Sequence, residues 1–321
     1  MIPSNTIDFE KQKTIGITEP ISLDGPNELE TKLDELFEKT LSKISPPESE
    51  EDKSKQKRIL NELSQIFINW LRNATKKRDG NASNAEHNNA ISDSSEFAHT
   101  APLVYTYGSF RLGVHERGAD IDTLLIGPNN VTHSMFFEDL CATVLEKHEK
   151  VTEFSTAPNA FVPIAKFVYD GVSIDLIYAQ TSKMVLDESF DIHDDEVMRA
   201  VIPQTIRSLN GVRVTDLLLD LVPNKSVFRK AVRFLKIWAK RRGIYGNSIG
   251  YLGGVSYSIM AGRICQLYPK ANTAMILKQF FEIYDLWHWP TPVCLTHIRM
   301  DGPGDHAVWN REVQIYCKIY A

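Results

Sequence analysis

Three acidic residues are spaced so that they could gather around divalent cations. Asp120 and Asp122 are separated by Ile121, and Asp175 lies further along the chain. In a β-strand, alternate side chains point to the same face, so Asp120 and Asp122 would share a face while Ile121 enters the core. Carboxylate oxygens are the ligands that Mg²⁺ prefers. Alone, this pair is better explained as an ordinary surface strand or turn, but a Gly-Ser turn upstream and the third carboxylate favour a metal site.

The third carboxylate belongs to a predicted β-hairpin. Asp170-Gly171 separates two apolar runs and is typical of a two-residue hairpin turn. Asp175 is a charge inside the second run, where burial without a partner would be unfavourable. Two interpretations stay open: Asp175 pairs with a nearby Lys or Arg, or it joins Asp120 and Asp122 around two cations.

The Gly-Ser turn lies before the Asp-x-Asp pair. Backbone amides near Gly108 and the hydroxyl of Ser109 could hold phosphate oxygens, as amide nests do for anions. No Walker A run is present in the sequence. Two ions about 4 Å apart would lower the pKa of an attacking hydroxyl and neutralise leaving phosphates. Asp120 and Asp122 would bridge both ions, and Asp175 would complete the hydroxyl-activating site.

Longer motifs around these residues resemble the catalytic core of eukaryotic poly(A) polymerases, which belong to the DNA polymerase β-like nucleotidyltransferases. The resemblance covers roughly residues 14 to 295 and is carried by Gly16–Leu23, Tyr107–His115, Gly118–Asp122, Ser173–Asp175, Ser208–Asp216, Ile237–Arg241, Tyr251–Ser256, Gln266–Pro269 and Trp287–Pro290. It implies template-independent addition of AMP from ATP to RNA 3′ ends, with two Mg²⁺ or Mn²⁺ ions held by the three aspartates. Such a site needs positioning and charge neutralisation, not a protein nucleophile, so we assign no acid-base role to His115.

The same resemblance implies a wider set of nucleotide-binding residues. They contact ATP and the RNA 3′ end or pack on the nucleotide: Tyr107, Gly108, Ser109, Lys236, Tyr245, Asn247, Gly254 and Val255. Four of them also have a plain structural interpretation: Lys236 as a solvated helix residue, Tyr245 and Asn247 as loop residues, and Gly254 as a helix-start glycine. The resemblance further implies cleavage and polyadenylation factors as partners, and a nuclear location.

Two other functions stay open at this stage. The chain could be a uridylyltransferase or an oligoadenylate synthetase of the same superfamily. It could also be a non-catalytic protein that binds RNA or another partner, because the family's pattern is lost after residue 300 and its third, RNA-binding domain is not recognisable. We therefore expect a central domain that is shortened and an RNA-binding domain that is absent.

Composition narrows the class of protein. The 321 residues are 43% apolar and 24% charged, as in a soluble globular protein with two domains. The start lacks the features of a signal peptide, and no apolar run is long enough to span a membrane, so we expect no membrane partner. The four cysteines are scattered without a Cys-x-x-Cys pair, which indicates reduced thiols and no zinc site.

The net charge of −5 conceals a basic segment. Between Lys225 and Arg242 there are eight Lys or Arg and no Asp or Glu. On a helix, four of the cations would form one outward stripe, called here the basic stripe: Arg229, Arg233, Lys236 and Lys240. The opposite face would be buried through Val227, Ala231, Phe234, Leu235 and Trp238. A solvated face is the usual explanation of such a stripe, but binding of polyphosphate or RNA backbone is favoured here because it includes Lys236.

The elements that must position these residues indicate an α/β nucleotidyltransferase domain with a mixed sheet, followed by a mostly helical central domain. Periodicity predicts helices and strands over 27–45, 54–77, 104–106, 134–148, 161–180 (the hairpin), 227–242, 254–267 and 274–284. Residues 78–99 are predicted to be a disordered insertion and 187–196 a solvated acidic loop. The expected limits are 55–205 for the catalytic domain and 1–54 with 206–321 for the central domain.

Overall fold

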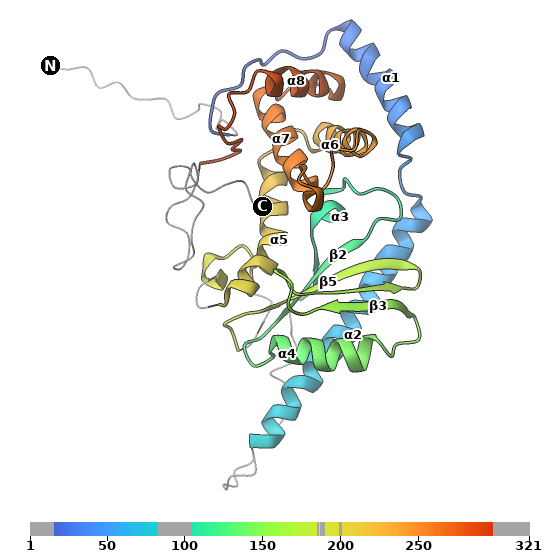
Figure 1. Cartoon of the computed structure of the whole chain (residues 1–321), viewed down its shortest axis with the longest axis vertical. Coiled ribbons are helices and arrows are strands. Elements are labelled where there is room, and N and C mark those ends of the chain that lie inside the picture. The colour runs from blue at the N-terminus through green and yellow to red at the C-terminus, as the bar shows by residue number, and fades with distance from the viewer. Residues whose placement is uncertain (1–15, 83–103, 185, 187–189, 199–200, 298–321) are drawn as a thin grey trace, which may run out of the picture. The chain divides into compact units, whose positions relative to one another are not determined.

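The structure is a computed structural model, and it describes residues 16–82, 104–184, 186, 190–198 and 201–297 (Figure 1). The chain forms two compact units. One contains residues 40–217 and is called the sheet unit, and the other contains residues 218–298 with those up to 39 and is called the helical unit. The domain limits expected from the sequence stay a prediction.

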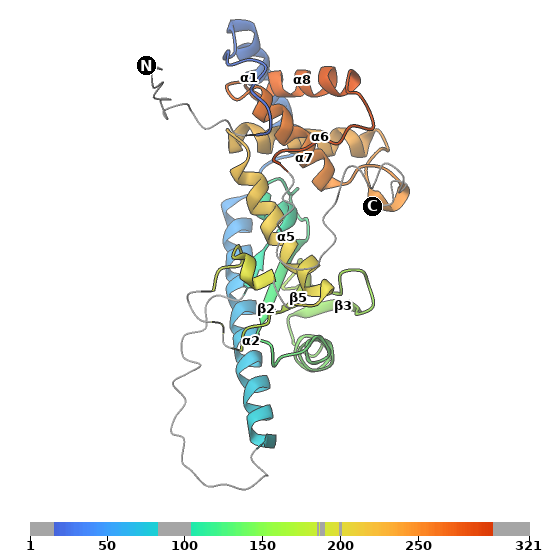
Figure 2. The ribbon, with the colours of Figure 1, turned by 90° about the vertical axis from the view of Figure 1, so that its left-hand side faces the viewer.

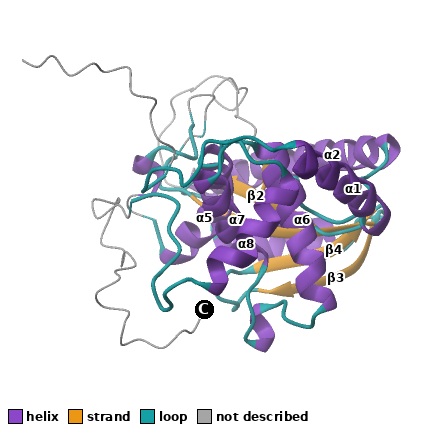
Figure 3. Cartoon of the chain, turned by 90° about the horizontal axis from the view of Figure 1, so that it is seen from above, coloured by secondary structure: helices purple, strands orange, loops and turns teal. Residues whose placement is uncertain are grey.

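Within the described residues, the sheet unit is built on five strands in the order β1-β2-β5-β4-β3. β2 and β5 are parallel, and the other neighbouring strands are antiparallel. β3 and β4 lie together at one edge, as the orange strands of Figure 3 show. The strands are β1 (Val104–Thr106), β2 (Ile121–Gly127), β3 (Val151–Ala157), β4 (Ile164–Tyr169) and β5 (Val172–Gln180). The predicted mixed α/β sheet is confirmed.

The predicted hairpin is present as β4 and β5. Asp170 and Gly171 have φ of 48° and 76°, which a two-residue type I′ turn requires. The edge strand β3 was not predicted from the sequence. Most of its side chains are exposed, so it lacks apolar alternation, and Glu153 sits in an irregularity with φ of 52°. An edge strand of this kind gives no period-two signal.

Helices cover the sheet and supply its core. α2 (Glu50–Ala82) runs along one side of the sheet (Figure 2). The segment predicted as one helix over 134–148 forms a short α4 (His133–Met135) and a π-helix, η1 (Phe136–Leu145). Tyr178 of β5 packs between η1 and α2. The centroid of its ring lies 5.1 Å from that of Phe136 in η1 and 6.5 Å from that of Trp70 in α2. α2 extends five residues into the predicted insertion 78–99, and residues 83–99 lie outside the described part of the chain.

The acidic segment before the next helix is anchored by two apolar side chains. Within the described residues 190–196 the acidic side chains are mostly exposed, as expected for a solvated acidic loop over 187–196, whereas Phe190 and Ile192 are buried. These two apolar side chains hold the segment on the core. The segment leads through η2 (Asp195–Met198) into α5 (Pro203–Asp220).

The helical unit contains the helices predicted for the central part of the chain. These are α6 (Lys225–Arg241), η3 (Asn247–Ile249), α7 (Gly254–Leu267) and α8 (Thr273–Asp285), joined by the start of α1 (Glu28–Ile44). α6, α7 and α8 pack on one another. Phe37 of α1 lies edge-on to Phe234 of α6, with ring centroids 5.3 Å apart. The expected helical class is confirmed. No helix among the described residues has both the length and the apolar character needed to cross a bilayer.

The basic stripe does not point outward as expected. Lys236 is only 7% exposed, and Arg229 and Arg233 are half-buried, which leaves Lys240 as the exposed member of the four. The reason is that α6 packs against α7, α8 and α1, so it is covered on more than one side. A helix covered in this way needs a wide apolar face, here Phe228, Ala231, Val232, Leu235, Ile237 and Ala239.

Candidate active site

The carboxylates lie at the beginning of the two parallel strands. Asp122 of β2 and Asp175 of β5 are direct register partners, so they share one face of the sheet. Asp120 is exposed and immediately precedes β2, and Ile121 is fully buried as predicted. The structure thus places Asp122 and Asp175 side by side, with Asp120 near enough for its charge to act on Asp122.

Negative charge accumulates around Asp122. Burial, and then the neighbouring charges of Asp175 and Asp120, raise the pKa of the Asp122 carboxyl to about 6. Lys166 and a hydrogen bond from the Ser109 backbone act in the opposite direction but do not compensate. An excess of buried negative charge next to the solvent-facing Asp120 fits a divalent cation.

Asp175 also pairs with a lysine, which is the other interpretation that the sequence left open. Lys166 stands opposite it on β4, and the two side chains form an ion pair. Asp175 is 15% exposed and Lys166 is 52% exposed. Within the described residues, no three His, Cys, Asp or Glu side chains are already gathered as a metal cage. Asp122 and Asp175 are therefore adjacent, and the charge of Asp175 is compensated by Lys166.

The Gly-Ser turn is attached directly to Asp122. It opens the short helix α3 (Gly108–Leu112), and the N–H of Tyr107 donates to the Asp122 carbonyl at 3.0 Å. Gly108 has φ of 59°, and a Cβ there would overlap the Asp122 carboxyl, so only glycine fits. The Ser109 amide hydrogen-bonds to Asp122, and the Gly108 N–H donates to the Thr215 hydroxyl at 3.2 Å. Both amides that the sequence suggested for phosphate thus have protein partners.

Tyr107 is half-buried beside the same carboxylates. Burial, and then the charges of Asp122 and Asp175, raise the pKa of its hydroxyl far above the usual range, so it stays protonated. Its ring packs on α5, where a Cβ at Gly211 would lie 2.9 Å from it. Gly211 is therefore required by the close approach of the Tyr107 ring.

The remaining predicted nucleotide-binding residues belong to the helical unit. A Cβ on Gly254 would lie 3.0 Å from the Tyr245 hydroxyl, and one on Gly253 would lie 3.0 Å from the Asn247 amide. The Tyr245 ring stacks on Tyr257 with centroids 6.0 Å apart. The structure thus brings Tyr245, Asn247 and the start of α7 together.

Other members of this group differ in exposure. Val255 is half exposed, whereas Lys236 is buried in α6. Lys240, one turn further along, places its ammonium 5.5 Å from the centre of the Tyr245 ring. Lys240 is therefore one cation that lies beside Tyr245.

Some residues around the aspartates were not identified from the sequence. Lys166 could have been found by counting back from the Asp170-Gly171 turn, because hairpin register places it opposite Asp175. Thr215 and Asp216 gave no such signal, although they belong to a motif that carried the family resemblance. His115 has a structural environment, since its Nε2 lies 2.8 Å from Glu48 and its ring contacts Phe110.

Comparison with known proteins identifies the family of this chain. Residues 16–222 match the poly(A) polymerase nucleotidyltransferase domain, and residues 227–319 match the poly(A) polymerase central domain. The poly(A) polymerase of Dictyostelium discoideum is 41% identical over 297 residues, which are 92% of this chain and 35% of that protein. Nuclear poly(A) polymerase 4 of Arabidopsis thaliana is 40% identical over 299 residues, which are 93% of this chain and 39% of that protein. The chain spans little more than a third of the length of these two relatives.

Among solved structures, the polymerase core of TRAMP, an RNA surveillance complex, matches 81% of this chain and 66% of its own with 18% identity and a TM-score of 0.45. That similarity is too low to support a conclusion about this chain. The family matches are decisive, since the nucleotidyltransferase match alone covers more than half of the 321 residues and includes all three aspartates. The resemblance recognised in the motifs is confirmed: this chain belongs to the poly(A) polymerase family.

Proposed function

We propose that this chain transfers AMP from ATP to the 3′ end of RNA without a template. The observation that carries the proposal is the direct pairing of Asp122 and Asp175 on parallel strands, with Asp120 beside them, inside a poly(A) polymerase nucleotidyltransferase match. In the reaction, the RNA 3′ hydroxyl loses its proton to solvent as its oxygen bonds to the α-phosphorus of ATP. The bond from the α-phosphorus to the bridging oxygen of the β-phosphate breaks, and pyrophosphate leaves.

Polymerase-type nucleotidyltransferases generally use divalent metal ions, and the residues of this chain fit them. Asp122 and Asp175 are register partners, and burial and the charges of Asp175 and Asp120 raise the pKa of Asp122, which is what a bound cation would relieve. We propose that Asp120, Asp122 and Asp175 hold two ions, Mg²⁺ or Mn²⁺. When bound, such ions would lower the pKa of the attacking hydroxyl and neutralise the phosphates.

The protein's own groups then orient the reactants. Asp122 must be ionised to act as a ligand, and at neutral pH it is, because its pKa of about 6 lies below 7. Its position is fixed by the Tyr107 and Ser109 amides. Since the amides of Gly108 and Ser109 are occupied, the Ser109 hydroxyl is the group of this turn that we assign to phosphate.

We assign the helical-unit residues to nucleotide and RNA 3′-end contacts. Tyr245, Asn247, Gly254 and Val255 lie together, and Tyr245 presents a ring that Tyr257 supports from behind. Aromatic rings offer a sequence-tolerant surface for bases. We also assign Lys236 to this nucleotide-binding region, as a buried cation. Lys240 is an exposed cation of the same helix.

The family also suggests a cellular setting. Relatives from Arabidopsis thaliana are named nuclear poly(A) polymerases. We propose that this chain acts in the nucleus, in mRNA polyadenylation, together with cleavage and polyadenylation factors. We further propose that residues 55–205 form the catalytic domain and that residues 1–54 with the segment from 206 form the central domain.

A nucleotide-resolved extension assay tests the proposal. Purified protein is incubated with a short RNA bearing a 3′ hydroxyl, Mg²⁺ or Mn²⁺, and each NTP separately. We expect ATP-dependent extension with release of pyrophosphate, and none from the Asp175→Asn variant. A preference for UTP would identify a uridylyltransferase. RNA binding without extension by any nucleotide would identify a non-catalytic binder.

A further inference from the structure

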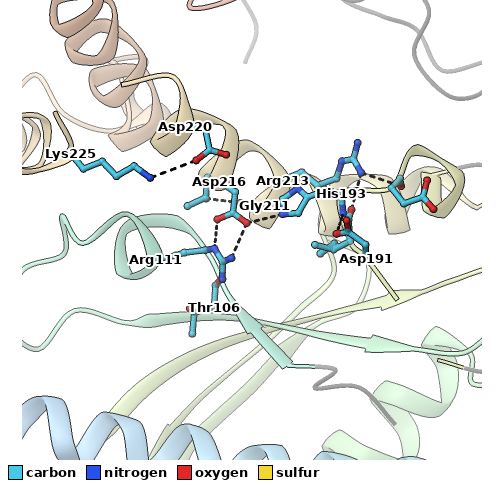
Figure 4. A network of polar contacts seen from close by, with 12 residues as sticks. Thr106, Arg111, Asp191, His193, Gly211, Arg213, Asp216, Asp220 and Lys225 are labelled. Carbon is cyan, nitrogen blue, oxygen red and sulfur yellow. Dashed lines mark hydrogen bonds and ion pairs between the residues drawn. The ribbon is translucent and has the colours of Figure 1, made fainter. Parts of the chain in front are cut away.

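We propose that Thr215 and Asp216 of α5 are positioning residues that hold the Gly108–Ser109 turn against Asp122. The proposal deepens the function above, on which it depends only for its activity measurement. Both residues lie in the sheet unit with the turn and the carboxylate, and their contacts are drawn in part in Figure 4.

The first contact is made by the Thr215 hydroxyl. It accepts the Gly108 N–H at 3.2 Å and donates to the Gly211 carbonyl at 2.7 Å, so it links the turn to the backbone of α5. Thr215 is 5% exposed, and water is therefore a poor substitute for its hydroxyl. Removing one partner of a buried hydrogen bond leaves the other unsatisfied.

The second contact is an ion pair of fork geometry. Arg111, in the last turn of α3, directs Nε and Nη2 at the two carboxyl oxygens of Asp216, the latter at 2.8 Å. Arg111 also donates to the Thr106 carbonyl at the end of β1, and His193 lies 3.0 Å from Asp216 on its other side (Figure 4). A bidentate pair fixes both distance and orientation. Asp216 therefore sets the orientation of α3.

These contacts act on Asp122 because the turn and the carboxylate are joined. The Ser109 amide hydrogen-bonds to Asp122, and the Asp122 carboxyl occupies the space that a Cβ on Gly108 would need. A turn that moves away from α5 would move the Ser109 amide with it. Since Gly211 also lets the Tyr107 ring pack on α5, three points of one helix hold the residues before and within the turn.

Amide exchange and metal binding test the proposal with four variants. Thr215→Val keeps the side-chain shape without the hydroxyl, and Thr215→Ser keeps the hydroxyl. Asp216→Asn removes the charge, and Asp220→Asn makes the same change on the same helix, where Asp220 is 75% exposed. Hydrogen exchange of the 107–113 peptide and Mn²⁺ binding by electron paramagnetic resonance are measured on folded protein, with ATP-dependent extension as a third measurement.

We expect Thr215→Val and Asp216→Asn to speed exchange in this peptide and to weaken Mn²⁺ binding by about tenfold each, whereas Thr215→Ser and Asp220→Asn stay within about twofold of wild type. Equal losses in Thr215→Ser or Asp220→Asn, or unchanged exchange in Thr215→Val and Asp216→Asn, would overturn the proposal. If wild type adds no nucleotide, the proposed function fails, while exchange of the turn still decides the role of Thr215 and Asp216.

Discussion

The two groups of candidate residues are held by different kinds of structure. Asp122 and Asp175 are register partners on hydrogen-bonded strands, so backbone geometry fixes their separation. Tyr245 and Asn247 lie in the segment between α6 and α7, where Gly246 has φ of 124° and side chains approach the backbone closely. The sheet unit therefore offers a pre-organised cluster of charge, and the helical unit offers a surface defined by loop packing. We expect changes in the first to act on the chemical step and changes in the second to act on nucleotide affinity.

The largest effect is expected for Asp122→Asn. The substitution keeps the side-chain shape, removes the charge between Asp120 and Asp175, and replaces one acceptor oxygen by a donor nitrogen. Because charge neutralisation dominates phosphoryl-type transfer, we expect the rate of AMP addition to fall by about 1,000-fold or more. Steady-state extension at saturating ATP measures this. A fall of less than about tenfold would mean that the carboxylate cluster is not the chemical centre.

The same variant should be more stable than wild type when no metal is present. The pKa of Asp122 is raised from 3.8 to about 6 in the folded protein, so folding favours the protonated carboxyl. The wild-type protein therefore loses stability as pH rises from about 4 to about 6. Asp122→Asn does not lose it, because its amide does not ionise. We expect the variant to gain about 2–3 kcal/mol at pH 7 and nothing below pH 4.

Urea unfolding in a chelator at several pH values measures the difference. A difference that does not change with pH would mean that the ionisation of Asp122 is not its source.

The contrast between the units also shows what the sequence could predict. Alternation along a strand identifies the face of Asp122, and the Asp170-Gly171 turn gives the partner of Asp175 by counting. The parallel pairing of β2 with β5 is long-range and cannot be counted from a turn. The bond between Gly108 and Thr215 joins residues 107 positions apart, and no local pattern contains it.

For a helix, the sequence does not show which of its faces are covered by other helices. A period of 3.6 residues gives the angle between Lys236 and its neighbours on α6, but it does not reveal how many other helices cover α6. The sequence predicts an outward basic stripe because it indicates a single buried apolar face on the opposite side of the helix. The structure covers α6 from several sides, and Lys236 is buried.

Substitution of this lysine gives the next largest effect. We expect Lys236→Ala to lower the free energy of unfolding by about 1–3 kcal/mol, because a buried side chain with bound partners is removed. Lys225→Ala, at the exposed start of the same helix, is the control and should change stability by less than about 0.5 kcal/mol. Thermal unfolding of both variants measures the effect. Equal stabilities would restore the outward position expected from the sequence.

A smaller effect is expected where the helical unit packs its loop on α7. In Gly254→Ala the new Cβ would lie 3.0 Å from the Tyr245 hydroxyl, so the ring must shift by a few tenths of an ångström. We expect KM for ATP to rise by about three- to tenfold with little change in kcat. Tyr245→Phe removes the oxygen that causes the contact, so the double variant should recover part of the loss. Additive losses would show that the Tyr245 hydroxyl is not the group displaced.

The smallest effect is expected at Lys166, and it should have the opposite sign. Lys166 pairs with Asp175 from the neighbouring strand and opposes the charge around Asp122. A divalent cation must share or replace that interaction, so Lys166→Met should strengthen Mn²⁺ binding by about two- to fivefold, a modest change because the ammonium is half exposed. Lys150→Met, which breaks the pair of Lys150 with Glu62, is the matched control. Weaker Mn²⁺ binding in Lys166→Met would instead mean that this lysine holds Asp175 in the position that the metal needs, and the carboxylates would then depend on a side chain as well as on strand register.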